Sequence, residues 1–167
     1  MAFPLDQMRS LLSQGPQSPR HLLAKLSISQ PSLSRLVAHL GDDVVRLGAA
    51  RSIQYALRDR HRGVGDVPVY RIQTSGQLER LGVLTPVRPE GFVMRQDDDR
   101  TLYSPGLPWW LLDMRPQGFL GRAYAKRHAQ RLGLGPNVQH WSDAEALRAL
   151  LAHGHDAQLH ARSRWVR

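Results

Sequence analysis

Residues 18–40 of the chain, SPRHLLAKLSISQPSLSRLVAHL, predict two short helices joined by a tight turn. In both halves of this stretch apolar side chains recur at three- and four-residue intervals, as on the buried face of a helix. They are Leu22, Leu23 and Leu26 in the first half, and Leu33, Leu36, Val37 and Leu40 in the second. Ile28 lies between the two sets, where it can fill the angle between the helices. The spacing is typical of a helix-turn-helix unit.

The second of these helices carries polar side chains suited to reading DNA. Ser29 is a suitable N-cap because its hydroxyl can accept a free backbone N–H, and Pro31 falls in the first turn, where a missing N–H does no harm. Glutamine and arginine can form paired hydrogen bonds with base edges in the major groove. An ordinary helical hairpin shows the same apolar spacing, but we favour a DNA-binding unit. The residues that we expect on DNA are Ser29, Gln30, Ser32, Ser34, Arg35 and His39.

The flanking segments extend this unit to a winged helix-turn-helix domain at residues 1–62. Residues 5–14 have the spacing of a first helix, which Gly15 and Pro16 end. Residues 44–47 and 52–57 predict a hairpin, since apolar side chains alternate in its second strand. Arg46 and Arg51 lie on this wing, where they can reach phosphates or a minor groove. The alternative for these two arginines is a solvated hairpin edge.

Composition favours a nucleic-acid partner over a membrane. The chain of 167 residues has a formal net charge of +9 and a pI of about 11.1. A polyanion is therefore the expected partner, with nucleic acid ahead of a membrane surface. No apolar run is long enough to span a membrane, and the N-terminus has no signal-peptide core. The absence of cysteine excludes disulfides and suits the cytoplasm.

The rest of the chain predicts a second module at residues 66–156 and an α+β fold class overall. Residues 58–63 have the composition of a charged linker, and residues 67–94 predict three strands. Helices are expected at 107–114, with two tryptophans, and at 119–132, with a basic face. That face suits a nucleic acid, an acidic partner or solvent equally well. Residues Ser142 to Glu145 form a capping box that opens a last helix.

The C-terminal histidines are only weak evidence for a metal site. His153, His155, Asp156 and His160 are close in sequence, and such residues can hold zinc. Their spacing is irregular and follows a helix end, so we expect neither a metal nor another cofactor. Residues 157–167 are expected to form a basic tail.

Three segments resemble the N-terminal subdomain of HipA-type toxin kinases. They are YRI at 70–72, LPWWLLDMRPQGFLGR at 107–122 and ALRALLAHGHD at 146–156. With a winged helix in front, the chain is similar to the start of the YjjJ (HipH) branch of that family. The resemblance implies that a kinase core follows this region, but the chain contains no ATP-binding loop and no catalytic Asp…Asn pair. We therefore expect no enzyme activity. The sequence leaves open whether the chain is naturally short or truncated.

Together these features predict a DNA-binding transcriptional regulator related to toxin–antitoxin proteins. Double-stranded DNA is the expected partner, and such modules commonly act as homodimers on paired half-sites. An alternative is a protein-interaction module that pairs in trans with a HipA-like kinase core. A metal-dependent nuclease built on the histidine-rich tail is the third hypothesis, with the least support. The sequence identifies neither the operator nor the oligomeric state.

Overall fold

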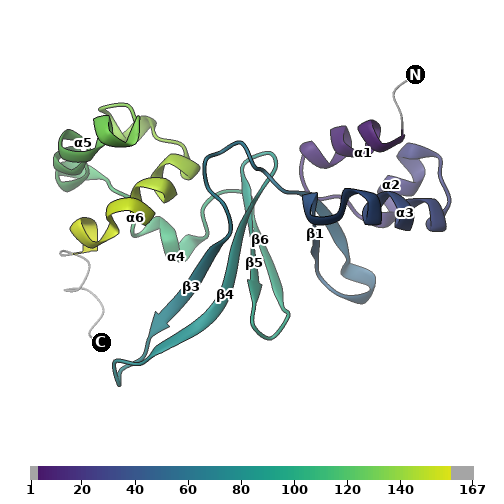
Figure 1. The fold of residues 1–167 in the computed structure, drawn as a ribbon, viewed down its shortest axis with the longest axis horizontal. Coiled ribbons are helices and arrows are strands. Elements are labelled where there is room, and N and C mark those ends of the chain that lie inside the picture. Colours follow the sequence, from purple (N-terminus) through teal and green to yellow (C-terminus); the bar gives the residue numbers. More distant parts are fainter. Residues whose placement is uncertain (1–3, 159–167) are drawn as a thin grey trace. The chain divides into compact units, whose positions relative to one another are not determined.

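The computed structural model of the chain describes residues 4–158, with side chains described as far as His153. The fold belongs to the α+β class, as predicted, and combines helices with two antiparallel sheets (Figure 1). It contains two compact units. Of the described residues, the first comprises 4–61 together with 65–105, and the second comprises 62–64 and 106–158. We describe each unit by itself.

Three helices begin the first unit: α1 (Pro4–Ser13), α2 (Pro19–Leu26) and α3 (Gln30–Leu40). The hydroxyl of Ser18 caps α2 by accepting the His21 backbone N–H at 3.2 Å. Ser27 ends α2 in a left-handed conformation, so that only a short turn separates it from α3. The helices share one core, whose fully buried members are Met8, Leu12, Leu22, Leu33 and Leu40. The predicted helical pattern is confirmed, including the contact of Ile28 with this core.

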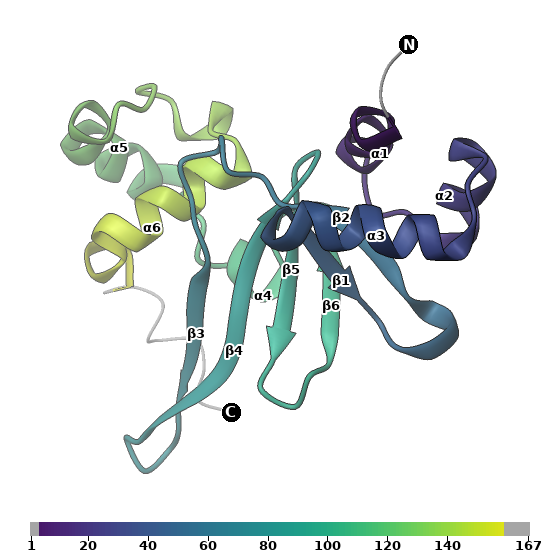
Figure 2. The same ribbon diagram turned by 45° about the vertical axis from the view of Figure 1, so that its right-hand side comes forward.

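A two-stranded hairpin follows, formed by β1 (Val44–Leu47) and β2 (Gln54–Leu57) (Figure 2). Leucine and tyrosine side chains of the hairpin complete the helical core. The second strand begins two residues later than predicted, because residues 50–52 form a short 3₁₀ helix instead. The Ser52 hydroxyl stabilises that turn by bonding both the N–H and the carbonyl oxygen of Ala49.

The second sheet of this unit has four antiparallel strands in the order β3-β4-β5-β6. Their bounds are Val67–Ile72, Leu78–Val87, Gly91–Gln96 and Thr101–Ser104. The first three were predicted. The fourth was missed, because its four residues, TLYS, contain only one strictly apolar side chain and follow the acidic run at 97–99.

The hairpin β1–β2 packs directly on this sheet, and their contact corrects the predicted linker at 58–63. Val45, Leu47 and Ala56 form a buried cluster with Val87 and Val93 of β4 and β5. Backbone hydrogen bonds then carry the connection across the expected linker. Asp59 N–H donates to the Pro86 carbonyl at 2.9 Å, and Arg88 N–H to the Leu57 carbonyl at 2.8 Å. The start of the segment is therefore anchored rather than free, because it pairs with the end of β4.

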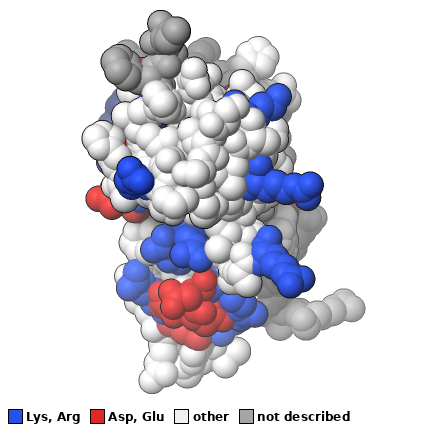
Figure 3. All heavy atoms as spheres, turned by 90° about the vertical axis from the view of Figure 1, so that its right-hand side faces the viewer, with Lys and Arg blue, Asp and Glu red and all other residues white. Residues whose placement is uncertain are grey.

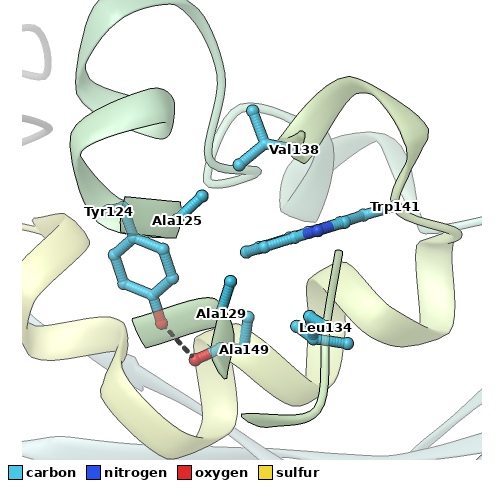
Figure 4. Close-up of a cluster of buried hydrophobic side chains, with 7 residues drawn as sticks. All are labelled: Tyr124, Ala125, Ala129, Leu134, Val138, Trp141 and Ala149. Atoms are coloured by element: carbon cyan, nitrogen blue, oxygen red, sulfur yellow. Dashed lines mark hydrogen bonds between the residues drawn. The ribbon is translucent and has the colours of Figure 1, made fainter. Parts of the chain in front are cut away.

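The second unit is helical, with α4 (Trp109–Leu112), α5 (Gly118–Leu132), a 3₁₀ turn (Val138–His140) and α6 (Asp143–Gln158). Its core lies between α5, the turn and α6 (Figure 4). Tyr124 donates its hydroxyl hydrogen to the Ala149 carbonyl at 2.8 Å, and the Trp141 indole N–H donates to the Gly135 carbonyl at 2.7 Å. Both large aromatic side chains are thus buried with their polar atoms bonded.

The predicted capping box at the start of α6 is confirmed. Glu145 N–H donates to the Ser142 hydroxyl at 3.3 Å, while the Glu145 carboxylate accepts the Ser142 N–H at 2.7 Å. A non-helical backbone conformation at His153 interrupts the helix near the residue where the sequence predicts its end. The side chains of His155 and Asp156, and all of His160 and the tail at 159–167, lie outside the described residues.

Candidate DNA-binding surface

The structure places the polar side chains of α3 on the side away from the helical core. Leu33 and Leu40 are fully or almost fully buried, and Leu36 and Val37 are half-buried against the same cluster. A helix presents residues three or four apart on one face, so the opposite face is left to solvent. Ser34, Arg35 and His39 are exposed there, and Gln30, three residues before the buried Leu33, is exposed at the N-terminal end of the helix.

Ser29 and Ser32 differ from the other predicted contacts because they bond each other. Ser29 holds the N-cap position of α3, as predicted, and its carbonyl accepts the Leu33 N–H at 3.0 Å. Its hydroxyl, however, caps no backbone N–H and lies 3.0 Å from the hydroxyl of Ser32. Ser32 is half-buried. One of the two hydroxyls must donate to the other, which leaves this pair fewer hydrogen bonds to offer a ligand.

The two predicted wing residues are exposed. Arg46 points away from the sheet because its neighbours in β1, Val45 and Leu47, are buried on the opposite face. Arg51 lies in the 3₁₀ turn at the tip. Across the described part of the chain, no ion pair or hydrogen bond joins either guanidinium to a side chain of α3.

The lysines and arginines between positions 4 and 61 fall into two groups. Those of the first group are held by carboxylates: Arg9 and Arg60 bind Asp43 at 2.8 and 3.0 Å, and Arg58 binds Asp66. Those of the second group form no ion pair with any described residue, and they are Arg20, Lys25, Arg35, Arg46 and Arg51. Figure 3 shows basic side chains spread over this side of the molecule, with the visible acidic side chains gathered mainly in one patch.

Asp43 illustrates the structural role of the first group. Hydrogen bonds from Arg9 and then Arg60 hold the pKa of the Asp43 carboxyl below its ordinary value of 3.8. Because Arg9 belongs to α1 and Arg60 follows β2, this carboxylate connects three segments of the unit. The first group therefore connects segments of the fold, whereas the second group has no carboxylate partner among the described residues.

Sequence reasoning did not single out Arg20 and Lys25 of α2 as members of the second group. Both are exposed on a helix with no acidic residue in its first turn. The charge count of the N-terminal segment was the available signal, but it does not separate paired from unpaired side chains.

The structure offers no metal centre among the residues that it describes. His153 stacks on the buried ring of His128 with the ring centroids 4.4 Å apart, and Tyr124 lies 4.7 Å from the same ring. His153 thus packs with aromatic side chains of the second unit. Within residues 4–158, no helix is long and apolar enough to cross a membrane.

Comparison with known proteins places the chain in a family. Residues 64–160 match the family described as YjjJ-like toxin, middle domain. The chain is also 39% identical over 148 residues to a protein named Toxin YjjJ from Escherichia coli (strain K12). This alignment covers 87% of the chain but 33% of that protein, so the chain spans about a third of its relative's length. No solved structure matches the chain.

The matched segment includes the four-stranded sheet and all the helices of the second unit. The resemblance to the YjjJ branch, which the sequence predicts from residues 70–72, 107–122 and 146–156, is confirmed by both comparisons. The chain therefore belongs to the YjjJ-like toxin family.

Proposed function

We propose that residues 1–62 form a winged helix-turn-helix domain that binds duplex DNA, with α3 as the recognition helix and β1–β2 as the wing. Three helices followed by an antiparallel hairpin are the element order of such a domain. An α-helix has a diameter of about 10–12 Å with its side chains and fits a major groove about 12 Å wide. The exposed part of α3 carries polar side chains in both halves of the helix and no large apolar one, which suits this placement.

The two ends of α3 have different tasks in this proposal. Recognition helices contact base edges mainly with their N-terminal residues. Gln30 and Ser34 lie in the N-terminal half, one turn apart, and Arg35 follows on the exposed face. Gln30 is suited to adenine and Arg35 to guanine, because each can form two hydrogen bonds with that base. His39 lies one turn beyond Arg35 and is placed to bind a phosphate at the groove edge.

The observation that carries the proposal is the group of five cations without an ion pair among the described residues. A cation that is already paired gains little from a phosphate, since it must first lose its carboxylate. Arg20, Lys25, Arg35, Arg46 and Arg51 have no such cost, and each one that meets a phosphate releases condensed counterions. DNA affinity should therefore fall steeply as the salt concentration rises.

We further propose that this DNA binding regulates transcription, in keeping with the toxin family to which the chain belongs. A winged helix of this size reads a short half-site, and two copies on an inverted repeat would double the contact. The expected operator is thus an inverted repeat bound by a homodimer.

A selection from random duplexes at two salt concentrations tests the proposal. The wild-type chain should recover a motif. A variant with Gln30→Ala and Arg35→Ala should lose preference for that motif by at least tenfold, because a bidentate contact contributes about 1–3 kcal/mol of discrimination. Weak, salt-sensitive binding should remain, because Arg46 and Arg51 are intact.

The matched control removes the same two side-chain types from the four-stranded sheet, as Gln77→Ala plus Arg95→Ala. Both residues are exposed there, and the proposal places neither on DNA. This control should bind like the wild type. If instead the α3 variant keeps the motif preference, α3 is not the reading helix and the assignment is wrong.

A second candidate function is a protein-interaction role for the second unit. Trp109 is 74% exposed and Leu112 43% exposed, although both belong to the apolar helix α4. Exposed tryptophan is enriched where proteins meet. The proposed partner is a HipA-like kinase core in trans. Such a core should co-purify with the wild-type chain and be lost with Trp109→Ala, whereas the DNA variant of α3 should retain it.

A further inference from the structure

Helix α5 of the second unit has an unusual charge distribution. Its fifteen residues, GFLGRAYAKRHAQRL, contain four lysine or arginine side chains and no aspartate or glutamate. Stable surface helices usually mix both signs, because opposite charges one turn apart attract and like charges repel. In α5 both charged pairs of this spacing, Arg122 with Lys126 and Arg127 with Arg131, are repulsive.

The core of the unit leaves these four charges on the exposed part of α5, with Arg122 and Lys126 on one flank and Arg127 and Arg131 on the other, because each residue turns a helix by about 100°. Tyr124, Ala125 and Ala129 lie on the buried face, where they pack against Trp141 and Val138 (Figure 4). The remaining face is left to solvent, and its basic side chains are Arg122, Lys126, Arg127 and Arg131, all of them exposed.

None of these four side chains forms an ion pair with a described residue. The comparison within the same unit is Arg115, which binds the Asp143 carboxylate at 2.6 Å and also the Trp141 carbonyl. Arg148 lies close enough to Glu145 to lower the pKa of that carboxyl, although less than the Ser142 N–H does. Arg115, which supports the fold of this unit, thus has a carboxylate partner, while the basic side chains on the outer face of α5 have none among the described residues.

An exposed aromatic ring lies at the N-terminal end of the same face. Phe119 is 76% exposed, which is the largest exposure among the large apolar residues described. The Arg122 guanidinium is 6.0 Å from the centre of its ring, within reach of a cation–π interaction. This phenylalanine is not part of the buried core, and although Arg122 lies over one face of the ring, most of the side chain is exposed and accessible to a ligand.

We propose that the outer face of α5, from Phe119 to Arg131, binds single-stranded nucleic acid. Proteins that bind single strands without sequence preference combine basic side chains along the backbone with aromatic rings that stack on bases. Here Phe119 would stack on a base and Arg122 would hold the adjoining phosphate. Lys126, Arg127 and Arg131 would follow the strand over the length of the helix, about 18 Å at 1.5 Å per residue.

The exposed ring is what favours a single strand over the alternatives. In a duplex the bases are stacked on each other, so a surface that meets only phosphates has no use for Phe119. An acidic protein segment would bind the four cations equally well, but it offers no flat π-face to the ring. This inference is independent of the winged-helix proposal, because it concerns residues of the other unit.

Fluorescence anisotropy of the full chain with a labelled 20-nucleotide oligothymidylate tests the inference. Phe119→Ala should weaken binding about tenfold, while Phe119→Trp should restore it. Arg127→Gln plus Arg131→Gln should also weaken binding and make the salt dependence shallower by about 1.4 in log–log slope, since each lost phosphate contact contributes about 0.7 for single strands. Gln130→Ala, an exposed neighbour without charge, serves as the matched control.

Four further measurements make the result decisive. Far-ultraviolet circular dichroism must show that each variant unfolds at the wild-type temperature, which is expected because every altered side chain is exposed. Arg35→Ala should leave oligothymidylate binding unchanged, which separates this surface from α3. The inference would be overturned if the arginine variant weakened binding to a 20-base-pair duplex of random sequence as much as binding to oligothymidylate, while Phe119→Ala changed the binding of neither probe. It would also be overturned if polyglutamate displaced oligothymidylate completely and Phe119→Ala had no effect on oligothymidylate binding.

Discussion

The backbone N–H of Gly48, at the tip of the wing, donates a hydrogen bond of 2.6 Å to the side-chain hydroxyl of Thr101 in β6. These residues are 53 positions apart in the chain. The bond joins the hairpin β1–β2 to the four-stranded sheet beside the buried cluster of Val45 and Val93. The wing of the proposed DNA-binding domain is therefore held at its tip by the sheet that belongs to the family's middle domain.

Replacing Thr101 with valine should release the tip of the wing. The valine keeps the size and β-branched shape of threonine but cannot accept the Gly48 N–H. The free energy of unfolding should fall by about 0.5–1.5 kcal/mol, the net contribution of one such hydrogen bond. Amide hydrogen exchange followed by NMR should show faster exchange at Gly48. Thr101→Ser keeps the hydroxyl and should retain the wild-type exchange rate, and equal rates in the valine variant would contradict the anchoring role.

Replacing Gly48 with alanine should destabilise the unit more strongly. Gly48 has a φ of +68°, and a Cβ at this position would lie 2.6 Å from the Ser52 carbonyl oxygen. A left-handed conformation costs a non-glycine residue about 1–3 kcal/mol, and the close contact adds to this cost. Thermal unfolding followed by circular dichroism should show a lower midpoint. The control is Gly65→Ala, where a Cβ meets nothing within 4 Å; a midpoint as low as that of Gly48→Ala would contradict the explanation.

Asp43→Asn should lower stability in a way that depends on pH. The folded-state pKa of Asp43 lies below 3.8, because Arg9 and Arg60 stabilise the ionised form. A carboxyl with a lowered folded pKa stabilises the fold above its unfolded pKa and loses this contribution as pH falls through the folded pKa. Near pH 7 the two exposed pairs should contribute together about 0.5–2 kcal/mol.

Urea unfolding of the wild type and Asp43→Asn at a series of pH values measures this effect. The difference between the two proteins should be largest near neutrality and should disappear below the ordinary aspartate range. High salt should reduce it as well, since surface ion pairs are screened. A difference that stays constant down to pH 2 would show that the charge of Asp43 is not the cause.

Ser142→Ala should weaken the second unit through the start of α6. The variant removes the hydroxyl that accepts the Glu145 N–H, and N-cap serines contribute about 0.5–2 kcal/mol. Tryptophan fluorescence during urea unfolding provides the measurement, because Trp141 is buried next to this cap. Ser142→Asp restores an acceptor and should recover most of the loss; if both variants unfold alike, the cap does not stabilise the unit.

Local patterns in the sequence were sufficient to predict several elements of the fold. The three helices at the N-terminus follow from leucine spacing, and the capping box follows from serine and glutamate three residues apart. Such features depend on interactions between near neighbours in the chain, so the residues themselves specify them. The family resemblance was also readable, because it rests on a long run at 107–122 that includes the exposed Trp109 and Phe119.

Other features depend on a choice between neighbouring partners or on residues far apart in the chain, and they could not be predicted from the sequence. The Ser29 hydroxyl could bond either a backbone N–H of the first turn or the Ser32 hydroxyl, and only the folded structure shows that it bonds Ser32. Asp59 reads as part of a charged linker, yet it is 3% exposed and its carboxylate lies 3.3 Å from Arg88. Burial of this kind arises when the end of β4 comes alongside, which no local pattern encodes.

The sequence by itself determined the helices, the hairpin, the basic character of the chain and the α+β class, because periodicity and charge are properties of neighbouring residues. Only the tertiary structure decided which cations remain available for a polyanion. The sequence alone does not show that Arg9 has an ion-pair partner and that Arg35 has none among the described residues. Folding brings Asp43 to Arg9 and leaves Arg35 on an exposed helix face without a described carboxylate, because an ion pair requires atoms within about 4 Å across segments that the chain order keeps apart.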